Sequence, residues 1–133
     1  MSYVAIDTQI RTILGTVTGL NAIYDHEKKE LAKYPAACVT PAEHNNRPGD
    51  TAGNKRIYTF LIRVYIRVDE LDDYEASMRA LVDDIITKIE ANPTLNGACE
   101  YTQATNGKWL YQERELPVRV VEITVDANKR VNR

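Results

Sequence analysis

The sequence has few of the residue types from which catalytic and metal sites are usually built. Its 133 residues include two cysteines and two histidines, and its only serines are Ser2 and Ser77. Cys38 and Cys99 are far apart with no C-x-x-C spacing. We therefore expect two buried, reduced thiols rather than a disulfide or a zinc site.

The sequence motifs of common enzyme classes are also missing. His26 and His44 have no partner at metal-ligand spacing, so solvated loop positions are expected for both. Neither serine lies in a G-x-S-x-G turn, and the chain lacks G-x-x-x-x-G-K and a G-x-G-x-x-G run after a strand. The five carboxylates within residues 69–75 lack the glycine of a calcium loop and are typical of a first helical turn. These motifs therefore supply no candidate catalytic residue, metal ligand or cofactor site.

A strong charge of one sign and a long hydrophobic run are absent as well. Seventeen basic and 19 acidic residues give a formal charge of -2 and a sequence pI near 5.7, which argues against nonspecific nucleic-acid binding. The longest apolar runs are far shorter than the roughly 18 residues of a membrane helix, and MSYVAIDTQ at the start does not resemble a signal peptide. We expect a cytoplasmic protein with no membrane partner.

What is present is the composition of an ordinary folded domain, with 44% hydrophobic and 27% charged residues. The spacing of apolar residues predicts one helix over residues 3–14. A second helix begins at the capping box of Asp72 and Glu75 and ends at Asn92 and Pro93. Its predicted core positions are Met78, Leu81, Val82, Ile85, Ile86 and Ile89.

Strands are predicted at residues 21–25, 36–40, 55–70, 99–104, 109–113 and 118–125. The second strand should be short and end at Pro41, because residues 41–54 are rich in proline, glycine and asparagine and read as a long loop. We also predict a turn at Asn106 and Gly107 and a bulge near Val120, where the apolar alternation changes frame.

These elements predict an α+β fold with a mostly antiparallel or mixed sheet of about five strands. Two helices should pack on one face, and a long loop should precede the central strand. Residues 1–126 are expected to form a single domain, and residues 127–133 a flexible basic tail.

The central strand has the clearest pattern in the chain. One side carries Tyr58, Phe60, Ile62, Val64, Ile66 and Val68, and the other side, which includes the residues expected to face outward, carries Thr59, Arg63, Tyr65 and Arg67. The strand is unusually long, so its first part is expected to project beyond the sheet as one arm of a hairpin with the preceding loop. Arg63, Tyr65 and Arg67 fit cross-strand pairing with Glu113, Glu115 or Glu122, or a protein interface, better than a nucleic-acid surface.

Most of the chain resembles the small tail terminator, or tail completion, proteins of long-tailed bacteriophages and prophages. The resemblance rests mainly on YPAACVTPAE (residues 34–43) followed by RIYTFLIRVYIR (56–67). The acidic helix DDYEASMRALVDDIITKIEANP (72–93) and the late strand YQERELPVRVVEITVDA (111–127) complete it.

This resemblance implies a structural protein without enzymatic activity or cofactor that caps the end of the tail tube as a ring, usually of six subunits. Its partners would be further copies of itself, the tail tube protein and a head-completion or connector protein, while DNA only passes through the lumen. It would be found in the host cytoplasm during assembly and then in the virion. The implied contacts are Glu43, Arg47, Asp50, Lys55 and Arg56, and in an oligomer Arg63, Tyr65 and Arg67 would suit a subunit contact.

Three other functions stay open from the sequence. Head-closure and head-tail joining proteins of the phage neck are similarly small and poor in motifs. A sheet-based nucleic-acid-binding module would use Arg63, Tyr65, Arg67 and the basic tail. A small enzyme or ligand binder would need a deep pocket between sheet and helices.

Overall fold

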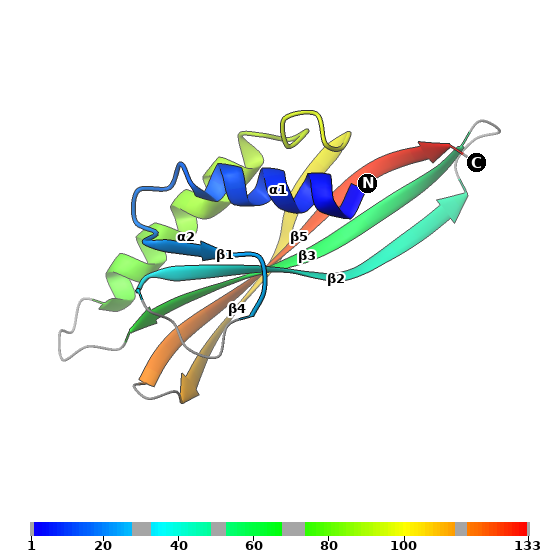
Figure 1. Cartoon of the computed structure of the whole chain (residues 1–133). Coiled ribbons are helices and arrows are strands. Elements are labelled where there is room, and N and C mark those ends of the chain that lie inside the picture. The colour runs from blue at the N-terminus through cyan, green and yellow to red at the C-terminus, as the bar shows by residue number, and fades with distance from the viewer. Residues whose placement is uncertain (1, 28–32, 49–52, 68–73, 114–116, 133) are drawn as a thin grey trace.

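The structure, a computed structural model, describes residues 2–27, 33–48, 53–67, 74–113 and 117–132. One layer consists of helices α1 (Ser2–Leu14) and α2 (Tyr74–Glu90), and the other is a five-stranded sheet (Figure 1). The strands are β1 (Ala22–Tyr24), β2 (Ala36–Pro48), β3 (Gly53–Arg67), β4 (Tyr101–Glu113) and β5 (Pro117–Asn132). Their order in the sheet is β1-β2-β3-β5-β4; β1 runs parallel to β2, and all other neighbours are antiparallel. The predicted α+β fold is confirmed.

The main core lies between the helices and one face of the sheet, which we call the covered face. The fully buried helical residues include Ile6, Ile10, Leu14, Met78, Ile85 and Ile89. They pack on inward-facing residues of the central strands, among them Phe60, Ile62, Val64, Val121, Ile123 and Val125. The helical and strand periodicities therefore predicted this core correctly, although Val68 and the Asp72 cap lie outside the described residues.

A second, smaller cluster is buried on the opposite face of the sheet, the open face. Cys38, Tyr65, Val118 and Val120 form it, and the half-buried Tyr24 and Tyr34 pack against them. Strand β5 therefore has apolar residues on both faces, and its pairing with β3 runs without a register shift from Val118 to Asn132. The bulge expected near Val120 is wrong, because the change of frame in the sequence reflects two buried faces rather than an inserted residue.

The largest difference from the prediction concerns residues 41–54. Instead of a long loop, Glu43–Pro48 continue β2 and pair in register with Asn54–Thr59 of β3. Residues 49–52 of the predicted loop lie outside the described residues. The only irregularity in this ladder is a register shift between Pro41 and Glu43. Polar composition did not prevent a strand here because the ladder with β3 supplies the backbone hydrogen bonds that a polar segment needs.

Two further predictions fail for the same reason. Asn106 and Gly107 do not form a turn; they lie inside β4, which absorbs the irregularity as a register shift between Ala104 and Asn106. Residues 127–132 are not a solvated tail, because β5 continues through Asn132 opposite Gly53. In both places the residues have a low strand propensity of their own, and pairing with a long neighbouring strand holds them in strand conformation.

Cys38 and Cys99 are both buried free thiols, as predicted. Burial raises the pKa of the Cys99 thiol, whose Sγ lies 3.0 Å from Thr102 Oγ1. In the described segments, no helix has the length and hydropathy needed to cross a bilayer.

Removing side-chain volume from the main core should cost much of the stability of this fold. Ile85→Ala leaves a cavity beneath α2, where the side chain is 0% exposed. The free energy of unfolding should fall by about 2–5 kcal/mol in urea denaturation. The matched truncation Val4→Ala, at a side chain that is 58% exposed on α1, should change it by less than about 0.5 kcal/mol. Equal effects of the two truncations would contradict the packing described here.

Candidate functional site

Three strands continue beyond the helices as a narrow projection, which we call the arm (Figure 1). It consists of residues 43–48 of β2, 53–59 of β3 and 126–132 of β5. Strand β4 begins at Tyr101, opposite Asn128, so the outer part of the arm is three strands wide. The first part of β3 forms one side of a hairpin with β2, as expected, but it does not leave the sheet, because β5 pairs along its other side.

The base of the arm is fastened to the first turn of α1. The Tyr3 hydroxyl lies 2.8 Å from His44 Nδ1, and the Tyr3 ring meets the Tyr58 ring edge-on with centroids 4.8 Å apart. Arg56 donates a hydrogen bond to the Tyr58 hydroxyl at 2.9 Å. Burial, with a smaller contribution from Tyr58, raises the pKa of Tyr3. His44 is exposed, as expected, but it lies in strand β2 rather than in the loop expected from the sequence.

Basic residues occupy two consecutive rows across the arm. Arg47, Lys55 and Arg130 lie opposite one another in the register of the three strands. In the next row, Arg56 lies opposite Lys129. Opposite residues of an antiparallel pair share a face, so Lys55 and Arg130 project from the open face and Arg56 and Lys129 from the covered face.

Like charges in directly opposite positions destabilise a sheet. An arm optimised only for its own stability would place acidic residues across from these cations, as the body of the protein does. There Arg63 donates to Glu122 on the neighbouring strand at 3.0 Å. The arm thus concentrates positive charge on a chain whose formal net charge is -2, which makes it an attractive surface for a partner that carries carboxylates or phosphates.

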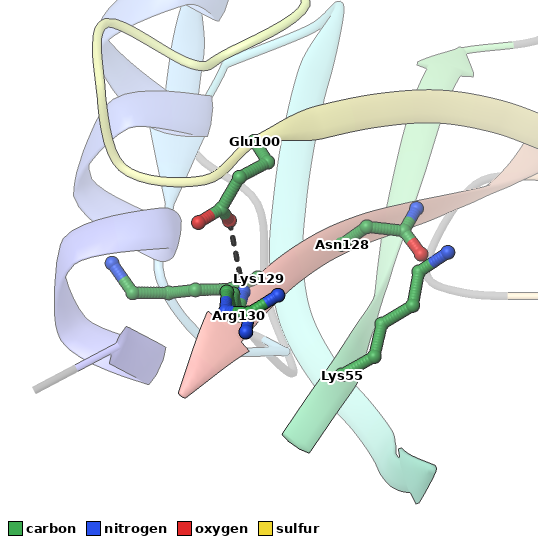
Figure 2. Close-up of a pocket in the computed structure, with 5 residues that line it drawn as sticks. All are labelled: Lys55, Glu100, Asn128, Lys129 and Arg130. Carbon is green, nitrogen blue, oxygen red and sulfur yellow. Dashed lines mark hydrogen bonds between the residues drawn. The ribbon is translucent and has the colours of Figure 1, made fainter. Parts of the chain in front are cut away.

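A hollow of about 260 Å³ lies in the arm beside residues of both basic rows (Figure 2). Its lining residues are Lys55, Glu100, Asn128, Lys129 and Arg130. Glu100 accepts the backbone N–H of Arg130 at 3.0 Å, and its own backbone N–H donates to Asn128 at 2.9 Å. Lys129 Nζ donates to the carbonyl oxygen of Ala98 at 3.1 Å. These bonds connect the arm to the segment between α2 and β4.

The structure separates the predicted contact residues into two groups. Glu43, Arg47, Lys55 and Arg56 lie in the arm, where Glu43 is exposed opposite Thr59. Thr59 donates to Asp126 at 2.6 Å. Asp50 lies outside the described residues.

The second group lies along β3 in the body of the sheet. Arg63 pairs with Glu122, one of the three partners expected, and approaches Glu27 at 3.5 Å. Tyr65 is 1% exposed, so the expectation that its ring faces outward is wrong; its face of the strand carries the second core cluster. Arg67 is exposed at the end of β3 opposite Val118. Lys55 and Arg63 are eight residues apart, which corresponds to roughly 27 Å along a strand, so the two groups do not form one site.

Sequence reasoning missed the contribution of the last strand to this site. Lys129 and Arg130 were predicted as part of a solvated tail, and Glu100 and Asn128 carried no signal of their own. The alternation of Val125 and Ala127 with polar residues was the one hint that the strand continues. Among the described residues, no three His, Cys, Asp or Glu side chains cluster in a way that could hold a metal ion.

Comparison with known proteins bears on the fold. No protein-family model and no curated protein matches this chain. Among solved structures, a chain of the "Virion of native gene transfer agent (GTA) particle" is similar, with a TM-score of 0.54 and 16% sequence identity. The match covers 96% of this chain and 93% of the other. At this identity the similarity shows a shared fold over nearly the whole of both chains.

Reversing one charge in the basic row should stabilise the protein. Lys55→Glu places a carboxylate opposite Arg47 and Arg130, and should raise the free energy of unfolding by about 0.2–1 kcal/mol at low salt. High salt should shrink the gain. The matched control is Lys108→Glu, which places a carboxylate opposite Glu122 and should lower stability by a similar amount. Urea denaturation of both variants at two salt concentrations measures these changes, and a destabilised Lys55→Glu would contradict like-charge repulsion in the arm.

Proposed function

We propose that this protein is a structural component of a phage-like particle. In this proposal it caps the end of the tail tube as an oligomeric ring, of six subunits as in the family it resembles, and provides the joining surface for the head connector. Further copies of the chain, the tail tube protein and the connector are its partners, and DNA passes through the lumen. The protein acts in the host cytoplasm during assembly and afterwards as part of the virion, without enzymatic activity.

The observation that carries this proposal is the projecting basic arm. Lys55 and Arg130 occupy opposite positions on one face of the arm. Their side chains are exposed, so a partner with carboxylates at matching positions could contact both cations at once. Arg47 lies opposite Lys55 in the same row and extends the surface across all three strands.

Two further observations support a virion protein over the alternatives. The fold similarity to a chain of a gene transfer agent virion agrees with the sequence resemblance to tail terminator proteins. A nucleic-acid module on β3 would need Tyr65 as a stacking platform, and that ring is buried. Arg63, its expected phosphate contact, is paired with Glu122.

The proposal is tested by measuring self-association and tube binding. Light scattering behind size exclusion over a concentration series, with negative-stain microscopy, should reveal rings, either free or at the ends of polymerised tail tube protein. A protein that stays monomeric at millimolar concentration and does not bind tubes would refute the proposal. Rings that bind the connector but not the tubes would indicate a head-closure or head-tail joining protein of the neck instead.

Charge reversal in the arm should weaken assembly even where it stabilises the subunit. Lys55→Glu and Arg130→Glu should each reduce ring formation or tube binding at least about ten-fold, which corresponds to about 1.4 kcal/mol. The matched control is Lys88→Glu, an exposed position on α2 away from the arm, which should bind as the unchanged protein does. Binding that is unaffected by both arm variants would remove the arm from the contact surface.

A further inference from the structure

Two side chains that line the hollow of the arm have polar groups without a partner in the described part of the chain. The Lys55 ammonium makes no hydrogen bond or ion pair there, and the side-chain amide of Asn128 makes no hydrogen bond there either (Figure 2). The bond between Asn128 and Glu100 uses the backbone carbonyl oxygen of Asn128 and leaves its amide group unused. Both the ammonium and the amide N–H groups are therefore available as donors to a ligand in the hollow.

Lys55 and Asn128 belong to a cluster on the open face of the arm. Lys55 lies directly opposite Arg130, and Asn128 lies two residues before Arg130 on β5, so all three side chains share that face. The Cβ atoms of directly opposite residues are about 5 Å apart, and those of diagonal neighbours about 7 Å. Two cations and one amide at these spacings can surround a single group that has two acceptor oxygens.

The charge of the hollow favours an anion. Among its described lining residues, Lys55, Lys129 and Arg130 are cations and Glu100 is the single carboxylate, which leaves an excess of two positive charges. The Glu100 carboxylate already accepts the backbone N–H of Arg130 at 3.0 Å, and Lys129 donates to the carbonyl oxygen of Ala98 at 3.1 Å. These bonds fix the walls of the hollow in the free protein, which lowers the entropic cost of binding.

The size of the hollow suits one side chain. Pockets for whole small-molecule ligands usually measure about 300–1,000 Å³, whereas a cavity of about 150 Å³ admits benzene. At about 260 Å³, the hollow has room for the carboxylate and stem of one acidic side chain. A nucleic acid fits less well, because its phosphates follow one another closely along the backbone and would also meet the carboxylate of Glu100.

We propose that the hollow is a binding site for a carboxylate, the end of an aspartate or glutamate side chain that projects from a protein partner. Lys55 and Arg130 contact its two oxygens, and the Asn128 amide donates a further hydrogen bond. This inference deepens the proposed function and rests on it for the partner, which is taken from the assembly. The site itself is defined by the arm alone.

A matched pair of small probes tests the site in the full-length protein. The N-acetyl amide of glutamate carries one carboxylate, and the N-acetyl amide of glutamine has nearly the same shape without the charge. In NMR titrations at low salt, the glutamate probe should shift the backbone resonances of Lys55, Glu100 and residues 128–130 in a saturable way, and the glutamine probe should not. Equal shifts with both probes, or no shifts with either, would overturn the site.

Asn128→Asp tests the same site from within, because it places a carboxylate of nearly the same size beside Lys55 and Arg130. This carboxylate should take the place of the partner's, so binding of the glutamate probe and of the assembly partner should fall at least about ten-fold. The urea midpoint should rise, whereas a purely structural role of Asn128 would lower it. The control Asn106→Asp makes the same change at an exposed position of β4 and should leave binding unchanged.

The outcomes separate this inference from the proposed function. If Asn128→Asp loses the probe but assembles normally, the hollow has no part in the assembly, and the proposed function stands. If the unchanged protein binds the probe but neither associates with itself nor binds tubes, the assembly partner and the proposed function both fall. A short DNA duplex whose binding is lost in Asn128→Asp and kept in Asn106→Asp would overturn the carboxylate in favour of a phosphate.

Discussion

The structure depends on the pairing of β3 with β5. All 15 residues of β3 have a partner in β5, from Gly53 opposite Asn132 to Arg67 opposite Val118. This ladder runs through the body of the sheet and through the arm without a register shift. Since the side-chain period of a strand is two, a slip of one residue would turn Ile123 and Val125 away from the helices and disrupt the core. The core therefore fixes the register in the arm as well.

Body and arm are stabilised by different interactions along the same strands. In the body, two helices cover one face, and the cluster around Tyr65 occupies part of the other. The arm carries mainly polar and basic residues, and its contacts with the body include the Tyr3 contact with His44 and Tyr58 and the bond from Lys129 to Ala98. Backbone hydrogen bonds and the stiffness of continuous strands hold it in place. Such a region should have the lower local stability of the two.

Periodicity predicted those elements in which one face is apolar. The spacing of Ile6, Ile10, Met78 and Ile85 predicted both helices, and the alternation along residues 58–66 predicted the central strand. It did not predict residues 43–48 or 127–132, because their strand conformation comes from long neighbours rather than from their own propensity. The candidate site lies in those segments. Lys55 and Arg56 were identified from the sequence, but their alignment with Arg130 and Lys129 depends on a register that only the structure reveals.

The arm is also the last part of this fold to be completed during synthesis. Its first two strands are made midway along the chain, but the third consists of residues 126–132. Until those residues leave the ribosome, residues 53–59 lack their β5 neighbour, and Lys129 and Arg130 are missing from the basic rows. Contacts over such a large sequence separation also form slowly. A chain interrupted before residue 126 would contain the residues of both helices and most of the sheet but lack the third strand of the arm, so the full basic surface requires β5 to be complete.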